Sequence, residues 1–329
     1  MLSSLIIFFI IINLILIYFF NYFSKIINIY DFPDNVRKFQ KKKIPLLGGF
    51  IFLMNIFFLF LIVNFFNFDF FIDNQYLLSF FFPVFLIFLI GVYDDKFNLS
   101  PYKKFFFISS VLLLVIYFDE GLRIKNLYFS TFNKSIFLGN FSIFFTILCF
   151  LLFINALNMF DGINLQTGSY FIILILFFII NKIFFNLSLI LLLPLIFFLY
   201  LNYRNKTYLG DSGTHIIAYI ICYIIVKQYN FRFSEISCEK IFILMMLPGL
   251  DMFRLFIERL LNFKNPFKPD RNHIHHLLIN VFNFKIVYLI INLFILLPIL
   301  LISLSELISI IFGIISYIVF LYNKKRFYL

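Results

Sequence analysis

The sequence has little charge, no tryptophan and few cysteines, and these shortages exclude whole classes of protein. Only 13% of its 329 residues are charged and 63% are hydrophobic, whereas a soluble domain is closer to half apolar and a quarter charged. A soluble globular protein is therefore excluded. The three cysteines, an odd number without paired spacing, indicate neither a disulfide framework nor a zinc site. No internal repeat or linker divides the chain, which predicts a single multi-span membrane domain over residues 1–329.

Long apolar stretches recur from one end of the chain to the other. A helix needs about 20 apolar residues to cross the ~30 Å hydrocarbon core. Met1–Phe23 has no basic leading segment and no small-residue cleavage site, so we expect a retained first helix rather than a signal peptide. The predicted fold is all-α, a polytopic integral membrane protein with about eleven transmembrane helices. Their expected ranges are 2–23, 46–66, 77–93, 105–118, 141–157, 169–181, 187–203, 214–227, 240–258, 284–302 and 307–322.

Basic residues are distributed unevenly over the predicted loops. Of the 27 Lys and Arg residues, 20 fall on the side that includes the loop after the first span, and seven fall on the other side. Because cytoplasmic loops carry the excess of Lys and Arg, the N-terminus is predicted outside and the C-terminus in the cytoplasm. We expect the active site on cytoplasmic loops near 24–45, 94–104, 158–168, 204–214 and 259–284.

Four polar clusters stand at the ends of predicted spans, all on the predicted cytoplasmic side. Ionisable groups at a membrane edge are costly to bury, which makes them candidates for function. The clusters are Asp94 and Asp95 in GVYDDKFNLSPYKK, Asn155, Asn158 and Asp161 in NALNMFDGIN, Asp211 in LGDSGTH, and His273, His275 and His276 in PDRNHIHH.

Each cluster also has a purely structural interpretation. An Asp-Asp pair can be a solvated loop start, and Gly-Asp-Ser-Gly is a common turn or helix cap. The asparagines could make interhelical hydrogen bonds, and the histidine run could be a solvated part of a basic loop. Their concentration on one side favours function, because random placement would scatter them over both sides.

The side chains in these clusters suit phosphate chemistry. Mg²⁺ binds a few protein oxygens together with substrate phosphates, and Asp211, Asn158 and the Asp-Asp pair supply such oxygens. Lys104 and Arg271, with the histidines, supply positive donors for phosphate oxygens. Phosphoryl transfer depends mainly on positioning and charge neutralisation, and a carboxylate can serve as base or nucleophile. The residues therefore predict a phosphate-handling enzyme at the cytoplasmic membrane surface.

Further motifs accompany these clusters in a fixed order between about Asp31 and Leu278. They are DxP…RK…IPxxGG from Asp31 to Gly49, GxxDDxxxLSPxxK at Gly91–Lys104, NAxNMxDGI at Asn155–Ile163, GDSG at Gly210–Gly213, LDxxR at Leu250–Arg254 and PFxPDRNHIHH at Pro266–His276. Together they resemble the polyprenyl-phosphate N-acetylhexosamine-1-phosphate transferases (glycosyltransferase family 4), in particular the bacterial undecaprenyl-phosphate N-acetylglucosaminyl-1-phosphate transferase branch. The HIHH form favours this branch over the muramoyl-pentapeptide transferases.

This resemblance implies a reaction and a location. An N-acetylhexosamine 1-phosphate, most simply N-acetylglucosamine 1-phosphate, would pass from a UDP-sugar to undecaprenyl phosphate with release of UMP, initiating the synthesis of a cell-envelope polysaccharide. The protein would lie in the bacterial inner membrane with its site facing the cytoplasm. Its partners would be the two substrates and the bilayer, with no nucleic acid. The sequence leaves open the downstream polymer and whether the chain forms a homodimer.

The resemblance also implies roles for individual residues. Asp94, Asp95 and Asp161 would be catalytic, the first two by deprotonating or orienting the attacking lipid phosphate. Asp211 and Asn158 would hold Mg²⁺, with Mn²⁺ as an alternative. Whether the lipid attacks directly or through an aspartyl intermediate stays open. The substrate-binding residues would be Lys104, Asn164, Arg271, His273, His275 and His276.

Departures from the family pattern concern the sugar more than the reaction. The family usually has His at the position of Gln40 and Ser at that of Thr214. It usually reads DGxDGL where this chain has Asn164, Leu165 and Gln166 in the last three places. Asn also occurs at the place of Asn164 in eukaryotic relatives, so Asn164 is compatible with activity, whereas Leu165 and Gln166 leave the identity of the donor open.

Two other classes of function compete with the transferase. A transporter or flippase for lipid-linked or nucleotide sugars would show internal repeats and polar groups near the bilayer midplane, whereas the polar groups here lie at helix ends. A catalytically silent scaffold is disfavoured because the acidic residues of all the motifs are present.

Overall fold

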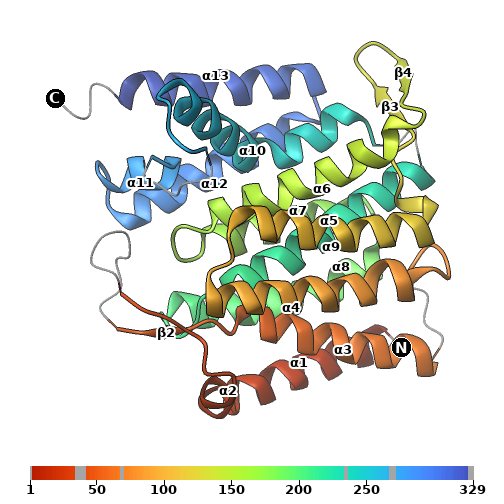
Figure 1. Cartoon of the computed structure of the whole chain (residues 1–329), viewed down its shortest axis with the longest axis vertical. Helices are drawn as coiled ribbons and strands as arrows, with labels where there is room; N and C mark the ends of the chain where they lie inside the picture. Colours follow the sequence, from red (N-terminus) through yellow and green to blue (C-terminus); the bar gives the residue numbers. More distant parts are fainter. Residues whose placement is uncertain (1, 34–41, 67–69, 233–235, 267–271, 325–329) are drawn as a thin grey trace.

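The computed structural model describes residues 2–33, 42–66, 70–232, 236–266 and 272–324, and this part of the chain is mostly helical (Figure 1). Each of the eleven predicted spans falls on helical residues, the first of them on two helices. The helices are α1 (Leu2–Tyr18), α2 (Phe20–Ile27), α3 (Gly48–Phe66), α4 (Phe82–Phe97, extended at its start by a π-helical turn, Leu77–Phe81), α5 (Pro101–Phe118), α6 (Phe141–Phe160), α7 (Gln166–Ile180), α8 (Phe185–Tyr203), α9 (Gly210–Phe231), α10 (Cys238–Leu261), α11 (Ile274–Ile279), α12 (Phe284–Leu301) and α13 (Glu306–Lys324).

Six of these helices are long and apolar enough to cross a membrane, or seven when α1 and α2 count as one bent span. The apolar stretches of α7 and α13 that were compared, Gln166–Ile180 and Glu306–Tyr322, are shorter than these spans. The helices α9 and α10 are long but carry charged residues. The prediction of an all-α polytopic membrane protein is confirmed, whereas the number eleven stays a prediction.

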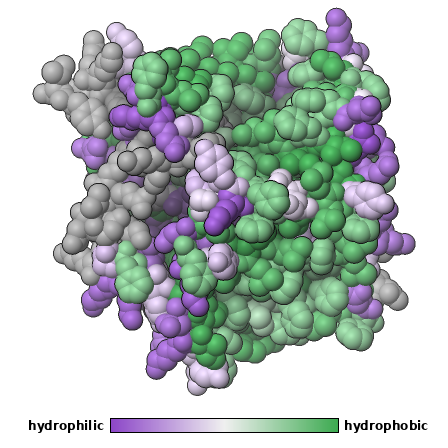
Figure 2. All heavy atoms as spheres, in the orientation of Figure 1, coloured by the Kyte–Doolittle hydropathy of each residue, from purple (hydrophilic) through white to green (hydrophobic). Residues whose placement is uncertain are grey.

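The surface carries a broad apolar band between two polar edges (Figure 2). Large apolar side chains are widely exposed, among them Phe65 at 76% and Phe106 at 67%. Exposure on this scale would be costly in water. Lipid tails would cover the same band without that cost, so the outer surface agrees with the composition.

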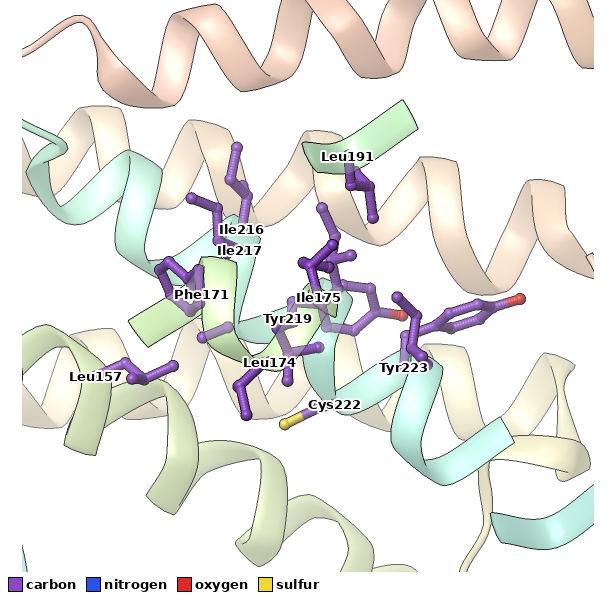
Figure 3. Close-up of a cluster of buried hydrophobic side chains, with 14 of the residues drawn as sticks. Leu157, Phe171, Leu174, Ile175, Leu191, Ile216, Ile217, Tyr219, Cys222 and Tyr223 are labelled. Carbon is purple, nitrogen blue, oxygen red and sulfur yellow. The ribbon is translucent and has the colours of Figure 1, made fainter. Parts of the chain in front are cut away.

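Helix α9 is the central element of the bundle. Every residue from Ser212 to Tyr229 is buried, as expected for a helix that other helices surround on all sides. Tyr219 and Tyr223 of α9 pack with apolar side chains from α6, α7 and α8 (Figure 3). Side chains at the two ends of α9 are therefore held in fixed positions relative to the surrounding helices.

The first span differs from the prediction of one helix over 2–23. The chain bends by 67° between α1 and α2. Helix α1 is almost uniformly apolar and is joined to α3 by reciprocal amide hydrogen bonds of 2.8 and 3.1 Å between Asn13 and Asn55. Helix α2 mixes Phe and Ile with Asn, Ser and Lys. Such an amphipathic segment is suited to the plane of the membrane interface, which explains the bend.

Two small antiparallel ribbons accompany the helices. Strands β1 (Tyr30–Asp31) and β2 (Ile44–Pro45) pair on either side of the basic loop after α2. Strands β3 (Asn126–Phe129) and β4 (Lys134–Phe137) form a hairpin between α5 and α6. The pairs lie at opposite ends of the bundle (Figure 1), so each marks one polar edge.

Candidate functional site

The predicted polar clusters come together at one end of the bundle. This is the end that carries β2 and α11 in Figure 1. The C-terminal ends of α4, α6 and α8 and the N-terminal ends of α5, α7 and α9 meet there, because successive helices run in opposite directions. Acidic and histidine side chains that are far apart in the sequence thereby become neighbours.

A lysine between two carboxylates forms the centre of this end. Lys104 Nζ lies 2.9 Å from Asp211 Oδ2 and also pairs with Asp94. We call Asp94, Lys104 and Asp211 the Lys104 trio. The Asp94 side chain is 4% exposed and that of Asp211 is 30% exposed. With all three groups ionised, the trio carries one net negative charge, and Asp211 is its accessible member.

Asp95 has a different environment from its neighbour. Its carboxylate accepts hydrogen bonds from the backbone N–H groups of Asp211 at 2.7 Å and of Ser212 at 3.1 Å. These are orphan donors of the first turn of α9, where a carboxylate is favoured by the helix dipole. Gly210 has a φ of +72°, and a Cβ there would lie 2.8 Å from Asp95 Oδ2. Asp95 therefore positions the start of α9, whereas Asp94 faces Lys104.

Glycines of two other motifs let the chain approach the start of α9 closely. A Cβ on Gly91 would lie 2.4 Å from Ser212 Cα, and one on Gly49 would lie 2.6 Å from Ser212 Oγ. The N–H groups of Gly48 and Gly49 donate to the carbonyls of Tyr208 and Leu209 at 3.0 and 3.2 Å. The IPxxGG, GxxDD and GDSG motifs thus pack against one another and fix the Lys104 trio.

The loop after α6 lies against the histidine motif. A Cβ on Gly162 would lie 1.9 Å from His275 Nε2, so only glycine fits between loop and imidazole. Burial raises the pKa of the neighbouring Asp161 to about 7. Burial also lowers the pKa of His275 well below its usual value, assisted by the adjacent His276. A carboxyl that titrates near neutrality and a neutral imidazole are typical of functional sites.

The asparagines of α6 have separate surroundings. Asn155 donates to the Leu151 carbonyl of its own helix at 2.7 Å. The side chain of Asn158, in the last turn, makes no hydrogen bond with any residue that the structure describes. Asp161 caps the helix in a non-helical conformation, so its carboxylate leaves the helical spacing of the two asparagines.

Asn164 is engaged by the loop after α8. Its amide donates to the Asn202 carbonyl at 3.3 Å and to the Asn205 side chain, and the Leu165 N–H donates to Asn202 Oδ1 at 2.7 Å. Leu165 has a φ of +68°, a conformation that favours glycine, the residue usual in the family pattern. In this structure the altered segment holds the loops at the site together.

The histidine motif is held by α10, through residues for which the sequence suggested no role. His273 Nδ1 lies 2.9 Å from Asp251 Oδ2, and Arg254 donates to the same carboxylate at 2.8 Å. The rings of His273 and His275 stack with their centroids 5.4 Å apart. The available signal was the LDxxR spacing, which places both charged residues on one helical face.

A divalent metal would fit this site only if the protein and a substrate phosphate together supplied its ligands. Among the described residues, no group of three or more His, Cys, Asp or Glu side chains is arranged to hold a metal. Mg²⁺ commonly takes one or two carboxylates and completes its shell with waters and substrate phosphates. Asp211, partly exposed beside Asp94, suits that arrangement. The amide of Asn158, the other predicted ligand, lies near the end of α6 and has no hydrogen-bond partner among the described residues.

Of the other residues singled out in the sequence, two lie outside the described part of the chain and two lie inside it. Arg271 and Gln40 lie outside the described residues. Thr214 donates within α9, to the carbonyls of Gly210 and Asp211 at 3.1 and 3.2 Å. His276 follows His275 in α11, with ring centroids 4.3 Å apart.

Fold and site together define a class: a polytopic helical membrane protein with acidic, glycine and histidine motifs joined at one end of the bundle. The particular resemblance follows from comparison with known proteins. Residues 77–228 match the model of glycosyl transferase family 4. That stretch contains the Lys104 trio and the Asp161 loop. The resemblance inferred from the motifs is therefore confirmed.

Similar curated proteins carry one kind of name. The undecaprenyl-phosphate alpha-N-acetylglucosaminyl 1-phosphate transferase of Escherichia coli (strain K12) is 29% identical over 266 residues, which cover 78% of this chain and 70% of that protein. The enzyme of the same name from Yersinia pestis is 27% identical over 274 residues, 77% of this chain and 70% of the relative. A probable undecaprenyl-phosphate N-acetylglucosaminyl 1-phosphate transferase of Bacillus subtilis is 26% identical over 199 residues, 58% and 55% of the two chains.

Proposed function

We propose that this protein transfers N-acetylglucosamine 1-phosphate from its UDP-sugar to undecaprenyl phosphate and releases UMP. The names of the similar proteins support this class of reaction. The observation that carries it is the Lys104 trio, two carboxylates and an ammonium at the start of a buried helix. Such a group offers both a metal ligand and a cation for phosphate oxygens.

The transfer forms one bond and breaks one. An oxygen of the lipid phosphate attacks the β-phosphorus of the UDP-sugar, the bond from that phosphorus to the bridging oxygen breaks, and UMP leaves with that oxygen. The chain has to orient the two phosphates in line and offset their negative charge. When bound, Mg²⁺ would supply most of that neutralisation, held by Asp211 with Asn158.

Lys104 and Asp94 act on the phosphates directly in this proposal. Lys104 already lies between two carboxylates, and a phosphate oxygen entering beside Asp211 would take one of the ammonium protons as a hydrogen bond. Asp94, almost fully buried, accepts a bond from the Leu99 N–H at 2.7 Å. It is held with one oxygen toward Lys104, where it would orient the attacking phosphate and receive its proton.

The donor would bind between the Asp161 loop and the histidines. Gly162 brings this loop against His275, so a nucleotide near Asp161 and Asn164 would have its pyrophosphate close to both groups. Neutral imidazoles can donate or accept hydrogen bonds to phosphate and sugar oxygens. Arg271 would add a permanent positive charge.

We place the site on the cytoplasmic side of a bacterial inner membrane, with eleven spans, the N-terminus outside and the C-terminus inside. The excess of Lys and Arg on that side supports this orientation. It agrees with the substrates, since a UDP-sugar is found in the cytoplasm and the lipid phosphate at the membrane face. A periplasmic reporter fused after His276 should be inactive, and an active fusion would invert the proposed topology.

A direct assay tests the reaction. Membranes containing the chain, undecaprenyl phosphate, Mg²⁺ and a panel of UDP-N-acetylhexosamines should release UMP and form a lipid-linked sugar, most with the N-acetylglucosamine donor. Release with another donor alone would change the assigned sugar. If folded protein yields neither UMP nor lipid-linked product with any donor, the transferase proposal is wrong and the flippase alternative gains weight.

A further inference from the structure

A buried carboxylate in α10, that of Asp251, collects hydrogen bonds from three elements. Its Oδ1 accepts from Arg254 at 2.8 Å, from the Tyr317 hydroxyl at 3.0 Å and from the Ile274 N–H at 3.2 Å. Its Oδ2 pairs with His273 Nδ1 at 2.9 Å. The side chain is 2% exposed, so its charge depends on these partners. Every donor except the histidine goes to one oxygen, which leaves the other oxygen to His273.

Tyr317, in the last helix, closes this arrangement. Its hydroxyl accepts from Arg254 Nε at 2.9 Å and donates to Asp251 Oδ1 at 3.0 Å. The side chain is buried, at 5% exposure. Removing the hydroxyl would leave one guanidinium N–H and one carboxylate lone pair without this partner, while the ring would still fill its place.

The carboxylate determines which nitrogen of His273 carries the proton. An ionised Asp251 accepts, so Nδ1 donates and Nε2 is left toward other partners. The His273 ring stacks on His275, with an angle of 6° between the ring planes, and His275 lies against Gly162. A continuous series of contacts therefore joins Tyr317 to the Asp161 loop.

We propose that Tyr317 is a positioning residue of the site, which orients His273 through Asp251. Tyr317 lies outside the motifs, which end near Leu278, and outside residues 77–228 that match the family. The kinetic part of this inference rests on the proposed function. Its structural part is independent of any reaction. The simpler alternative is that Tyr317 only attaches α13 to α10.

Selective labelling of histidine with ¹⁵N tests the structural part. The chain has only four histidines, and the His273→Gln variant assigns the signal of interest. At alkaline pH, Nδ1 of His273 should be protonated in the intact protein. Tyr317→Phe should lower that protonated fraction. Tyr322→Phe is the matched control, because Tyr322 lies in the same helix at 74% exposure and should leave the spectrum unchanged.

Kinetics test the consequence for catalysis. Tyr317→Phe should lower kcat for UMP release about tenfold, by analogy with the partners that orient metal-bound histidines. The KM of the UDP-sugar should change little. In a His273→Gln background, the same substitution should cause no further loss, because the residue through which it acts is already removed. The thermal midpoint should fall equally in both backgrounds.

Each result separates this inference from the proposed function. If Nδ1 of His273 keeps its proton in Tyr317→Phe, the inference is overturned whatever the activity. Independent, additive losses in the double variant would also overturn it, leaving Tyr317 as an attachment of α13. If the intact protein releases no UMP with any donor, the proposed function fails, while the tautomer measurement still decides the role of Tyr317.

Discussion

At each end of α9 a lysine lies between two carboxylates, Lys104 of α5 at the start and Lys227 of α9 itself near the other end, and the two groups have different surroundings. At the end opposite the site, Lys227 Nζ pairs with Asp119 at 2.6 Å and with Asp73. We call these residues the Lys227 trio. Lys227 is 3% exposed, against 13% for Lys104. A cation in the last turns of α9 is favoured by the helix dipole, as is the carboxylate of Asp211 in the first turn.

The Lys227 trio connects loops, and its lysine and Asp119 are buried, whereas Asp73 is 37% exposed. Asp119 is fully buried and also accepts from the Gly121 N–H at 2.9 Å, and a Cβ on Gly121 would lie 2.8 Å from Lys227 Nζ. The trio therefore fastens the loop before α4 and the loop after α5 to α9. Each trio thus has one accessible carboxylate, and what distinguishes the Lys104 trio is its place at the end of the bundle that carries the predicted motifs. Under the proposed function, identical residue types serve stability at one end and chemistry at the other.

A cavity also distinguishes the two ends. It has a volume of about 350 Å³ and lies near the ends of α7 and α9 that are away from the site. Its polar lining includes Lys240 and Glu306, which lie 3.5 Å apart. Glu306 also accepts from Ser130 and Ser237. These polar groups are occupied in binding the β3–β4 hairpin to α10 and α13. The motif end is therefore the better candidate for the functional site.

The largest expected effect is loss of activity at the Lys104 trio. Asp211→Asn and Asp94→Asn should each lower UMP release by about a hundredfold or more, because an electrostatic contact at the reacting phosphates is removed. Both proteins should insert into membranes normally. Activity is measured per folded protein in detergent. Near-normal turnover in both variants would contradict the assignment of this trio to the site.

The opposite trio should respond in stability. Lys227→Ala leaves Asp119 without its counter-charge, and breaking a buried pair costs about 3–5 kcal/mol. The thermal midpoint in detergent should fall sharply, while UMP release per folded molecule stays close to the original. A large fall in kcat with an unchanged midpoint would show that both ends take part in the chemistry.

A smaller effect is expected where the Asp161 loop touches the histidines. Gly162→Ala introduces a methyl group into the position of the His275 ring, and overpacking of this kind costs roughly 1–3 kcal/mol. The KM of the UDP-sugar should rise. Gly249→Ala is the control, since a Cβ there meets nothing within 4 Å. Equal kinetics in the two variants would separate this loop from donor binding.

The smallest effect is on the pH dependence of stability. Folding raises the pKa of Asp161 from 3.8 to about 7, so between these values the folded chain binds a proton that the unfolded chain has released. Raising the pH across this interval therefore lowers the free energy of unfolding. Asp161→Asn removes this contribution, so the variant should gain stability relative to the original as pH rises. A constant difference between their thermal midpoints would contradict the raised pKa.

Much of the site was predictable in its location and little of it in its contacts. Membrane-edge placement of acidic and histidine motifs followed from apolar spans, and the structure puts those motifs at one end. The separate surroundings of Asp94 and Asp95 were not predictable, because adjacent residues of a helix point about 100° apart. Nor was Tyr317, which meets Asp251 only when α13 packs against α10.

The sequence by itself determined the membrane class, most of the helical ranges and the motif resemblance. Backbone groups in lipid must be satisfied within each segment, so an apolar run of sufficient length already specifies a helix. Tertiary structure alone decided which residues meet: Lys104 with Asp211, 107 residues further along, and Gly162 with His275. Those contacts depend on how the helices pack side by side, and local composition does not specify that packing.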